Sequence, residues 1–476
     1  MGVGSTEPVP KQLNAVGRHV ALIGFMGAGK TTIAPELAAA LDRKAVELDE
    51  VVAQHVGDIG TAFATKGEAF FRVQEARRAV DVLERRSSLV VSLGGGAVTS
   101  PSVRSALSDA FTVLLDVDAA TAWARVGGTR PLAQEEQRFR ALHAERLPVY
   151  RSTADAVVES GDLDGVVLAA AGVRHELGAL KRLGELVPGD GAVALVADTT
   201  VLGIYGSAAQ QALGDRLTSV HELPSGERAK QLSVVEQLWS ELTLDRTGTV
   251  VALGGGALTD TAGFAAAAYL RRIAWVSVPT TLVGQVDAGI GGKTAIDTAQ
   301  GKNLVGAFHW PARVVIDEAL LETLPERERR QGQAELIKTE LLAGRPLDVR
   351  SAAAYKSALC VRDPHDRGPR NWLNLGHTFA HGLEAAADFD LPHGEAVALG
   401  LLAALRLSGR DPKPVVDVLD PQPVRVDRDR AWAALLRDKK RTGDEINLVL
   451  VGDEGPYVEA RPADEVRAAL DTLIRD

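Results

Sequence analysis

Residues 19–32 read HVALIGFMGAGKTT. Val20 to Ile23 form an apolar run, and Gly24 to Thr31 then match the pattern G-x-x-x-x-G-K-T at every position. In such a loop the glycines let successive backbone N–H groups converge on phosphate, and the dipole of the following helix favours negative charge. We therefore expect a strand, a phosphate-binding loop and a helix here, with nucleotide phosphates and Mg²⁺ held by Gly27, Ala28, Gly29, Lys30, Thr31 and Thr32.

The same order of strand, glycine turn and helix returns along the chain. Further apolar runs lie at 89–93, 112–115, 193–198, 250–253 and 275–279. Short apolar strands that alternate with helical stretches indicate parallel α/β sheets. After about Pro325 the sequence becomes rich in Ala and Leu at helical spacing. The fold class we expect is α/β, with a P-loop domain around a parallel sheet, a second α/β domain and then an all-helical domain.

A length of 476 residues exceeds what one hydrophobic core usually supports. The pattern loosens between about Ser152 and Asp190, where the junction between two domains should lie. We predict a disordered tail over 1–17, the P-loop domain over 18–172, the second α/β part over 173–330 and the helical part over 331–476.

Composition limits the classes of binding partner and the cell compartments that suit this protein. The formal net charge of −10 argues against nucleic acid as the main partner, and no apolar run reaches the roughly 20 residues that a membrane span needs. The only cysteine is Cys360, which fits a reducing cytoplasm. Residues 1–17 lack the apolar core of a signal peptide. We expect a cytoplasmic enzyme that binds small molecules.

Metal-ligand candidates lie in the helical part. His377 and His381 are four residues apart and share one face of a helix, with His393 after them and Glu335 before them. Two histidines and one glutamate make an open zinc site that leaves a position for substrate oxygen. The spacing alone leaves open which two of the three histidines bind the metal.

Five motifs accompany the phosphate loop in a fixed order. They are Glu47-Leu-Asp49, Gly67-Glu-Ala-Phe-Phe-Arg72, Gly94-Gly-Gly96, Arg130-Pro-Leu132 and Arg146-Leu-Pro-Val-Tyr150. With these motifs, residues 18–170 resemble shikimate kinase. The resemblance implies that ATP and Mg²⁺ are used, that Arg130 belongs to a lid over the ATP phosphates, and that shikimate is held by Asp49, Arg72, Gly95, Gly96 and Arg146. Arginine suits bidentate recognition of a carboxylate, and Asp49 can orient or deprotonate the attacking hydroxyl.

The second half carries longer motifs. Among them are Pro224-Ser-Gly-Glu227, Gly254-Gly-Gly-Ala-Leu-Thr-Asp260, Pro279-Thr-Thr-Leu282, Val286-Asp-Ala-Gly-Ile-Gly-Gly-Lys-Thr294, Gly301-Lys-Asn303 and Arg370-Asn-Trp-Leu-Asn-Leu-Gly-His377. From Ala192 onward the chain resembles 3-dehydroquinate synthase. The resemblance implies a Rossmann-like NAD-binding part and a zinc or cobalt ion on Glu335, His377 and His393, with His381 free for catalysis.

The resemblance also implies two sets of binding residues. NAD⁺ would be bound by Asp198, Glu227, Lys230, Gly255, Gly256, Asp260, Thr280, Thr281, Lys293 and Lys302. The sugar phosphate would be bound by Asp287, Lys293, Asn303, Lys338, Lys356, Arg370, Asn374, His381 and Lys440. Of these, Lys293, Lys338 and His381 join Asp49 and Arg130 as the expected catalytic residues. A homodimer through this half is a further implication.

The two resemblances together imply one bifunctional enzyme of the shikimate pathway to chorismate and the aromatic amino acids. One half would phosphorylate shikimate to shikimate 3-phosphate. The other would cyclise 3-deoxy-D-arabino-heptulosonate 7-phosphate to 3-dehydroquinate with release of phosphate. Because NAD⁺ would take and return a hydride in each turnover, no net redox change is expected.

The sequence departs from both families at a few positions. Glu47 stands where the kinase family usually has Asp, and the lid motif continues with Ala133 in place of a second Leu. Glu335 and His377 are 42 positions apart, fewer than usual, and Ala380 replaces a common Gly.

Three alternative functions remain open. The second half could be a sugar-phosphate cyclase that acts on another heptulose or hexose phosphate, although Arg370 favours a substrate with a carboxylate. It could be a metal-dependent alcohol dehydrogenase with net NAD turnover. One half could be a degenerate pseudoenzyme, against which the intact Lys30-Thr31 pair and the intact metal triad argue.

Overall fold

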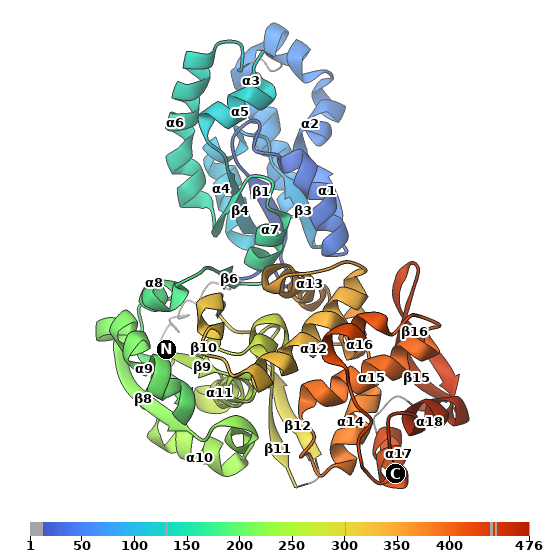
Figure 1. Ribbon diagram of the computed structural model, residues 1–476. Coiled ribbons are helices and arrows are strands. Elements are labelled where there is room, and N and C mark those ends of the chain that lie inside the picture. Colours follow the sequence, from blue (N-terminus) through green and yellow to red (C-terminus); the bar gives the residue numbers. More distant parts are fainter. Residues whose placement is uncertain (1–12, 129–131, 300, 438–440, 443–444, 476) are drawn as a thin grey trace, which may run out of the picture. The chain divides into compact units, whose positions relative to one another are not determined.

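The computed structural model describes residues 13–128, 132–299, 301–437, 441–442 and 445–475 (Figure 1). Two expected site residues, Arg130 and Lys440, lie outside these ranges, as does the N-terminal tail up to residue 12. The chain divides into two compact units, residues 1–173 and 174–476, which are described here one at a time. No helix among the described residues is both long and apolar enough to cross a membrane.

The first unit is built on a five-stranded sheet in which all neighbouring strands are parallel. The strands, in spatial order, are β2 (Lys44–Glu47), β3 (Leu89–Ser92), β1 (Val20–Ile23), β4 (Phe111–Asp116) and β5 (Ala156–Glu159). Every residue of β1 and β3 is buried, as expected for central strands covered on both faces. The helices are α1 (Lys30–Ala40), α2 (Leu48–Val56), α3 (Ile59–Leu83), α4 (Pro101–Ala106), α5 (Ala119–Val126), α6 (Glu136–Thr153) and α7 (Leu163–Ala170).

The second unit begins with a six-stranded sheet. Its strands, in spatial order, are β6 (Val173–His175), β13 (Arg313–Ile316), β10 (Ala274–Pro279), β9 (Thr249–Gly254), β7 (Val193–Asp198) and β8 (Leu217–Leu223). From β13 to β8 each neighbouring pair is parallel. The helices of this part are α8 (Leu183–Leu186), α9 (Thr199–Leu213), α10 (Leu232–Glu241) and α11 (Gly256–Ala268). The carboxyl ends of parallel strands gather at one edge of the sheet, where ligands of such folds bind.

An antiparallel hairpin and a group of helices complete this unit. The hairpin consists of β11 (Lys293–Thr298) and β12 (Gly301–Phe308). The helices are α12 (Glu326–Ala343), α13 (Val349–Arg362), α14 (His377–Ala386), α15 (His393–Leu407), α16 (Lys413–Leu419), α17 (Arg428–Arg437) and α18 (Ala463–Asp471). Helix α15 is buried along most of its length and lies at the centre of a core that also includes residues of α12 and α14.

The expectation of an all-helical C-terminal part needs one correction. Strands β14 (Arg441–Thr442), β15 (Glu445–Gly452) and β16 (Gly455–Pro462) form a small antiparallel sheet. Strand β15 alternates apolar and polar residues at its start and then buries Leu448 to Val451 in the same core as α15. This part is therefore mainly helical, with a hairpin packed on it.

Candidate active sites

The phosphate loop of the first unit has the expected strand–loop–helix form. Strand β1 ends at Ile23, and Gly24, Gly27 and Gly29 all adopt positive φ before α1 begins at Lys30. At Gly24 a Cβ would lie 2.7 Å from the carbonyl oxygen of Leu115, so a side chain there is excluded. The ammonium of Lys30 donates to the carbonyl oxygens of Gly24, at 2.8 Å, and Phe25, at 3.1 Å. The loop carbonyl groups thus hold the Lys30 side chain in place.

A cavity of about 220 Å³ opens over this loop. It joins residues that are far apart in the sequence: the loop, the end of β2, the start of α2 and the turn after β3. Of the predicted site residues, the cavity wall includes Gly27, Gly29, Lys30, Thr31, Thr32, Asp49 and Gly95. Glu47 and Arg125 also line the cavity. A triphosphate on the loop and an acceptor hydroxyl near Asp49 would therefore share one space.

The predicted arginines meet the glycine turn after β3. The Arg146 guanidinium lies 3.3 Å from the carbonyl oxygen of Gly95, which also accepts a hydrogen bond from the hydroxyl of Tyr150. A Cβ on Gly96 would lie 2.1 Å from Arg72, so this glycine makes room for the guanidinium. Arg72 is paired with Glu75 at 2.5 Å and with Glu68 at 3.1 Å.

The predicted NAD residues of the second unit lie mainly around the carboxyl edge of its sheet. Asp198 ends β7 and caps α9 by accepting from the backbone N–H groups of Thr200 and Val201. Gly255 and Gly256 follow β9 at the start of α11, and Thr280 and Thr281 follow β10. A Cβ on Gly255 would lie 3.1 Å from Thr281 Cγ2, so the two turns touch. The helix N-terminus of α11 faces the same edge, as a dinucleotide phosphate requires.

A buried polar pair stands beside this edge. The Lys230 ammonium donates to Asp260 at 2.7 Å and also to the side chain of Asn303. Burial raises the pKa of Asp260 to about 6, even with Lys230 beside it. Asn303, expected with the sugar phosphate, is therefore placed against two residues expected to bind NAD. The Lys302 ammonium lies 3.9 Å from the carboxylate of Glu227.

A second polar cluster contains three of the predicted sugar-phosphate residues. Asp287 accepts from Lys356 at 2.5 Å and lies 3.5 Å from Lys338. Lys338, which is 1% exposed, also pairs with Glu335 one turn earlier on α12. Burial alone lowers the pKa of Lys338, but the charges of Asp287 and Glu335 raise it above its usual value. Lys338 is thus held as a cation next to the metal candidates.

Other predicted residues of this set lie on the neighbouring loop. Arg370 is 1% exposed and donates to the carbonyl oxygens of Gly291, at 3.0 Å, and Pro364, at 3.2 Å. Lys293, expected in both binding sets, pairs with Asp366 at 2.5 Å. Burial and the charge of Arg370 lower the pKa of Lys293. Asn374 donates to the side chain of Asn371 at 2.6 Å.

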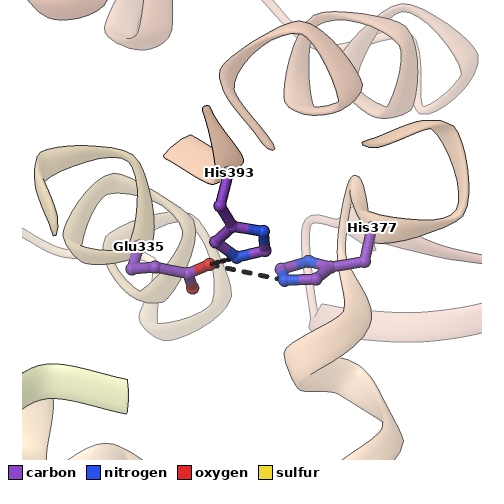
Figure 2. Close-up of side chains that lie close together, drawn as sticks. All are labelled: Glu335, His377 and His393. Carbon is purple, nitrogen blue, oxygen red and sulfur yellow. Dashed lines mark hydrogen bonds and ion pairs between the residues drawn. The ribbon is translucent and has the colours of Figure 1, made fainter. Parts of the chain in front are cut away.

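Glu335, His377 and His393 come together from three helices. Figure 2 shows both imidazoles directed at the Glu335 carboxylate. The Nε2 atoms of His393 and His377 lie 3.1 Å and 3.4 Å from the same oxygen, Oε1. Around a tetrahedral zinc ion with bonds of about 2.0–2.1 Å, ligand atoms are about 3.4 Å apart. The two glutamate–histidine distances are therefore close to those of a zinc site, and all three ligand atoms lie within 4.8 Å of one another.

The outer nitrogens of the two imidazoles are held as metal-binding histidines usually are. Nδ1–H of His377 donates to the carbonyl oxygen of Leu375 at 3.1 Å, and Nδ1–H of His393 donates to Glu384 at 3.2 Å. Both Nε2 atoms are thereby directed inward. Although burial alone raises the pKa of Glu335, the charge of Lys338 and the contact with His377 keep it well below its usual value. The third histidine, His381, has its ring centroid 5.6 Å from that of His377 and stands beside the cluster.

The sequence did not reveal four residues that contact these sites. They are Glu75, Arg125, Asp366 and Glu384. Glu75, Arg125 and Glu384 each lie on a helix that carries, or directly precedes, a recognised motif, and Glu384 is seven residues after His377 on the same helical face. The nearby motifs could have pointed to Glu75 and Arg125, and the seven-residue spacing from His377 could have pointed to Glu384. Asp366 has none, because its partner Lys293 is 73 residues away.

Both halves of the chain match known protein families. Residues 26–170 match the family model for shikimate kinase. Residues 220–331 and 313–416 match the models for the N-terminal and C-terminal parts of 3-dehydroquinate synthase. A 3-dehydroquinate synthase from Bordetella pertussis is 36% identical over 359 residues, which are 66% of this chain and 100% of that protein.

A solved structure has the fold of the second half. It is a 2-epi-5-epi-valiolone synthase from Streptomyces hygroscopicus with NAD⁺ and Zn²⁺ bound, with a TM-score of 0.54 and 25% identity. The match covers 63% of this chain and 96% of that one.

One relative matches nearly the whole chain. A bifunctional shikimate kinase/3-dehydroquinate synthase from Thermotoga maritima is 32% identical over 501 residues, covering 93% of this chain and 98% of that protein. The two domains expected from the sequence are therefore found together in a relative. The chain belongs to the family of bifunctional shikimate kinase/3-dehydroquinate synthases, with a shikimate kinase domain followed by a 3-dehydroquinate synthase domain.

Proposed function

We propose that this chain catalyses both reactions of its family. It transfers a phosphoryl group from ATP to shikimate, and it converts 3-deoxy-D-arabino-heptulosonate 7-phosphate to 3-dehydroquinate with release of phosphate. The observation that carries the proposal is the 93% coverage of this chain by a bifunctional relative. The side chains gathered at the two candidate sites support it.

In the kinase half, the residues suit phosphoryl transfer by positioning and charge. Lys30 and the loop N–H groups bind the ATP phosphates, and the Thr31 hydroxyl helps to hold Mg²⁺. Asp49 lies in the same cavity and orients the attacking hydroxyl. Arg72 and Arg146 bind the shikimate carboxylate beside Gly95 and Gly96, where paired guanidinium groups give bidentate recognition. The predicted lid residue Arg130 belongs to the proposal only by resemblance.

In the synthase half, the metal would be held by Glu335, His377 and His393. When bound, the metal ion polarises a substrate hydroxyl and NAD⁺ accepts and returns a hydride. The dinucleotide would lie along the sheet edge formed by Asp198, Gly255, Gly256, Thr280 and Thr281, with Glu227, Lys230, Asp260 and Lys302 beside it. Zinc or cobalt suits the two imidazoles and the carboxylate.

The remaining charged residues of this half bind the substrate. Asp287 holds the Lys338 and Lys356 side chains in place. Together with Lys293 they bind the leaving phosphate, to which the Asn374 amide donates a hydrogen bond. Arg370 is a buried, anchored guanidinium suited to a carboxylate. His381 stands beside the metal candidates and carries protons to and from the substrate. A sugar phosphate that also bears a carboxylate fits this set of charges.

A substrate panel tests the choice of cyclase reaction. The purified chain is given NAD⁺, Zn²⁺ and one of three compounds: 3-deoxy-D-arabino-heptulosonate 7-phosphate, sedoheptulose 7-phosphate or glucose 6-phosphate. We expect phosphate release from the first alone, and an Arg370→Met variant should lose it. Release from either of the others, unaffected by Arg370→Met, would instead make this half a sugar-phosphate cyclase with a different heptulose or hexose phosphate as substrate. Shikimate and ATP, followed by mass detection of shikimate 3-phosphate, test the kinase half separately.

We further propose that the chain is a cytoplasmic homodimer joined through its second unit and that it does not bind nucleic acid. Strand β12 supports the dimer, because Leu304, Val305 and Phe308 are about half exposed on a two-stranded hairpin. The net charge of −10 and the single buried cysteine support the other two points. Light scattering of the chain and of a Leu304→Lys variant tests the dimer: a monomeric wild-type chain would contradict it.

A further inference from the structure

Glu384 is a buried carboxylate that the proposed mechanism does not use. It is 4% exposed and lies on α14, seven residues after His377 and three after His381, so the three side chains share one face of the helix. A carboxylate in such a place is costly unless it is paired. Its partner is the Nδ1–H group of His393, which donates to Oε1 of Glu384 at 3.2 Å.

The imidazole of His393 has a second contact, on its other nitrogen, which has a different role. The Nε2 atom of His393 faces Glu335, and a metal ion bound there would replace that interaction. The Nδ1–H bond to Glu384 uses the opposite side of the ring, so a metal ion on Nε2 would not displace it. It also fixes the tautomer in which Nε2 has its lone pair free for a metal.

The backbone of His393 is already fixed by its neighbours. The next residue, Gly394, donates its N–H to the side chain of Gln331 at 2.5 Å, and a Cβ on Gly394 would lie 2.5 Å from the Cα of Gln331. The start of α15 is therefore pressed against α12, one turn before Glu335.

The imidazole of His393 is less confined than its backbone. Its side chain is 39% exposed, against 10% for His377. His377 is oriented by burial and by the carbonyl of Leu375. Packing alone thus leaves His393 free to rotate away from the site, and a specific acceptor is needed to hold it.

We propose that Glu384 is a positioning residue of the metal centre: its carboxylate orients the His393 imidazole and adds negative charge next to the ion without coordinating it. The inference rests on the proposed function only in requiring that Glu335, His377 and His393 bind a divalent metal.

The test measures metal affinity directly in the full chain. Glu384→Ala removes acceptor and charge, whereas Glu384→Gln keeps an acceptor oxygen and removes the charge. Glu328→Gln, an exposed carboxylate on α12, is the matched control. Zn²⁺ affinity is measured by competition with a chromophoric chelator, NAD⁺ affinity by titration, and ligand geometry from the visible spectrum of the Co²⁺-loaded chain.

We expect about 100-fold weaker Zn²⁺ binding for Glu384→Ala and about tenfold for Glu384→Gln, the range known for outer-shell partners of metal ligands. The Co²⁺ spectrum should change, while NAD⁺ affinity and the control variant stay at the wild-type level. Zn²⁺ affinities within twofold of wild type in both variants would overturn the inference, as would an equal loss of NAD⁺ binding, which indicates general damage. If Glu384→Ala does not fold, Glu384→Gln decides alone. A wild-type chain that binds no Zn²⁺ would refute the metal site itself.

Discussion

The fold of the second unit should be sensitive to acid through His309. This histidine follows strand β12 and is 4% exposed. Its Nε2–H donates to the carbonyl oxygen of Ile273 at 2.8 Å, and its Nδ1 accepts from the Arg272 guanidinium at 3.1 Å. The contact at Nδ1 requires the neutral ring, because only an unprotonated Nδ1 can accept a hydrogen bond. A proton on Nδ1 would face the arginine and break its hydrogen bond.

The surroundings of His309 determine how strongly, and in which direction, the free energy of unfolding changes with pH. Burial, followed by the charge of Arg272, lowers the pKa of His309 from 6.5 to about 4. At about 1.4 kcal/mol for each tenfold change in proton affinity, the difference is about 3 kcal/mol. Between pH 6.5 and 4 the unfolded chain binds more protons than the folded chain, so the free energy of unfolding rises with pH. The stabilisation is complete above pH 6.5 and is lost as the pH falls towards 4.

The assay is guanidinium unfolding of the full chain between pH 4 and 8, followed by tryptophan fluorescence. Five of the six tryptophans lie in residues 174–476, and the Trp275 ring centroid is 6.3 Å from that of His309. The comparison is with His309→Gln, whose amide can both donate to Ile273 and accept from Arg272 without titrating. The difference between the two curves should grow by about 3 kcal/mol as the pH rises from 4 to 6.5. A difference that does not change with pH would refute the reasoning.

Three further predictions concern the two sites. Lys30→Met should lower shikimate phosphorylation by about 100-fold or more and leave phosphate release by the synthase half unchanged; loss of both activities would contradict two separate sites. Asp49→Asn should cost the kinase about 10²–10⁴-fold in kcat with little change in the KM for ATP, and a shift confined to the ATP KM would argue against a role at the acceptor hydroxyl. Zn²⁺ at a hundred times its Kd should stabilise the EDTA-treated chain by about 2.7 kcal/mol, and Glu335→Gln should abolish this gain in a chemical unfolding series; an equal gain in the variant would place the metal elsewhere.

The parallel sheets were predictable because their strands are continuous apolar runs. Strands β1, β7 and β9 are buried at every position, and their polar residues, Thr249 and Asp198, stand only at strand ends. The phosphate loop was equally clear, since its glycines are needed at positive φ. These patterns are short and local, so they can be recognised in the sequence without knowledge of the rest of the fold.

The C-terminal hairpin was missed although its signal was present. Residues 446–451 read INLVLV, and a turn around Gly455 separates them from a second β-favouring run at Tyr457 and Val458. Two such runs around a short turn predict a hairpin. The Ala- and Leu-rich helices on either side led to the expectation of a helical domain. Strand β6, only three residues long, carries too little pattern to be found.

Side-chain partners were the least predictable part of the sites. Resemblance supplied the metal candidates, but the contact of His393 with Glu384 depends on how α14 and α15 pack, which no local pattern encodes. Likewise, Asn303 reaches Lys230 across 73 positions, and Lys293 reaches Asp366 across the same number. Such contacts follow from how β11, β12 and the loop after α13 pack, and that is decided by tertiary structure.

One measurement tests directly whether the second half is a metal- and NAD-dependent cyclase. Phosphate release from 3-deoxy-D-arabino-heptulosonate 7-phosphate is followed with NAD⁺ present, before EDTA treatment, after it and after Zn²⁺ is added back, while absorbance at the NADH band is recorded. We expect release that stops with EDTA, returns with Zn²⁺, and proceeds without accumulation of NADH. Steady NADH accumulation would instead indicate a dehydrogenase. No release from a folded chain that binds Zn²⁺ and NAD⁺ would contradict the proposed cyclase reaction.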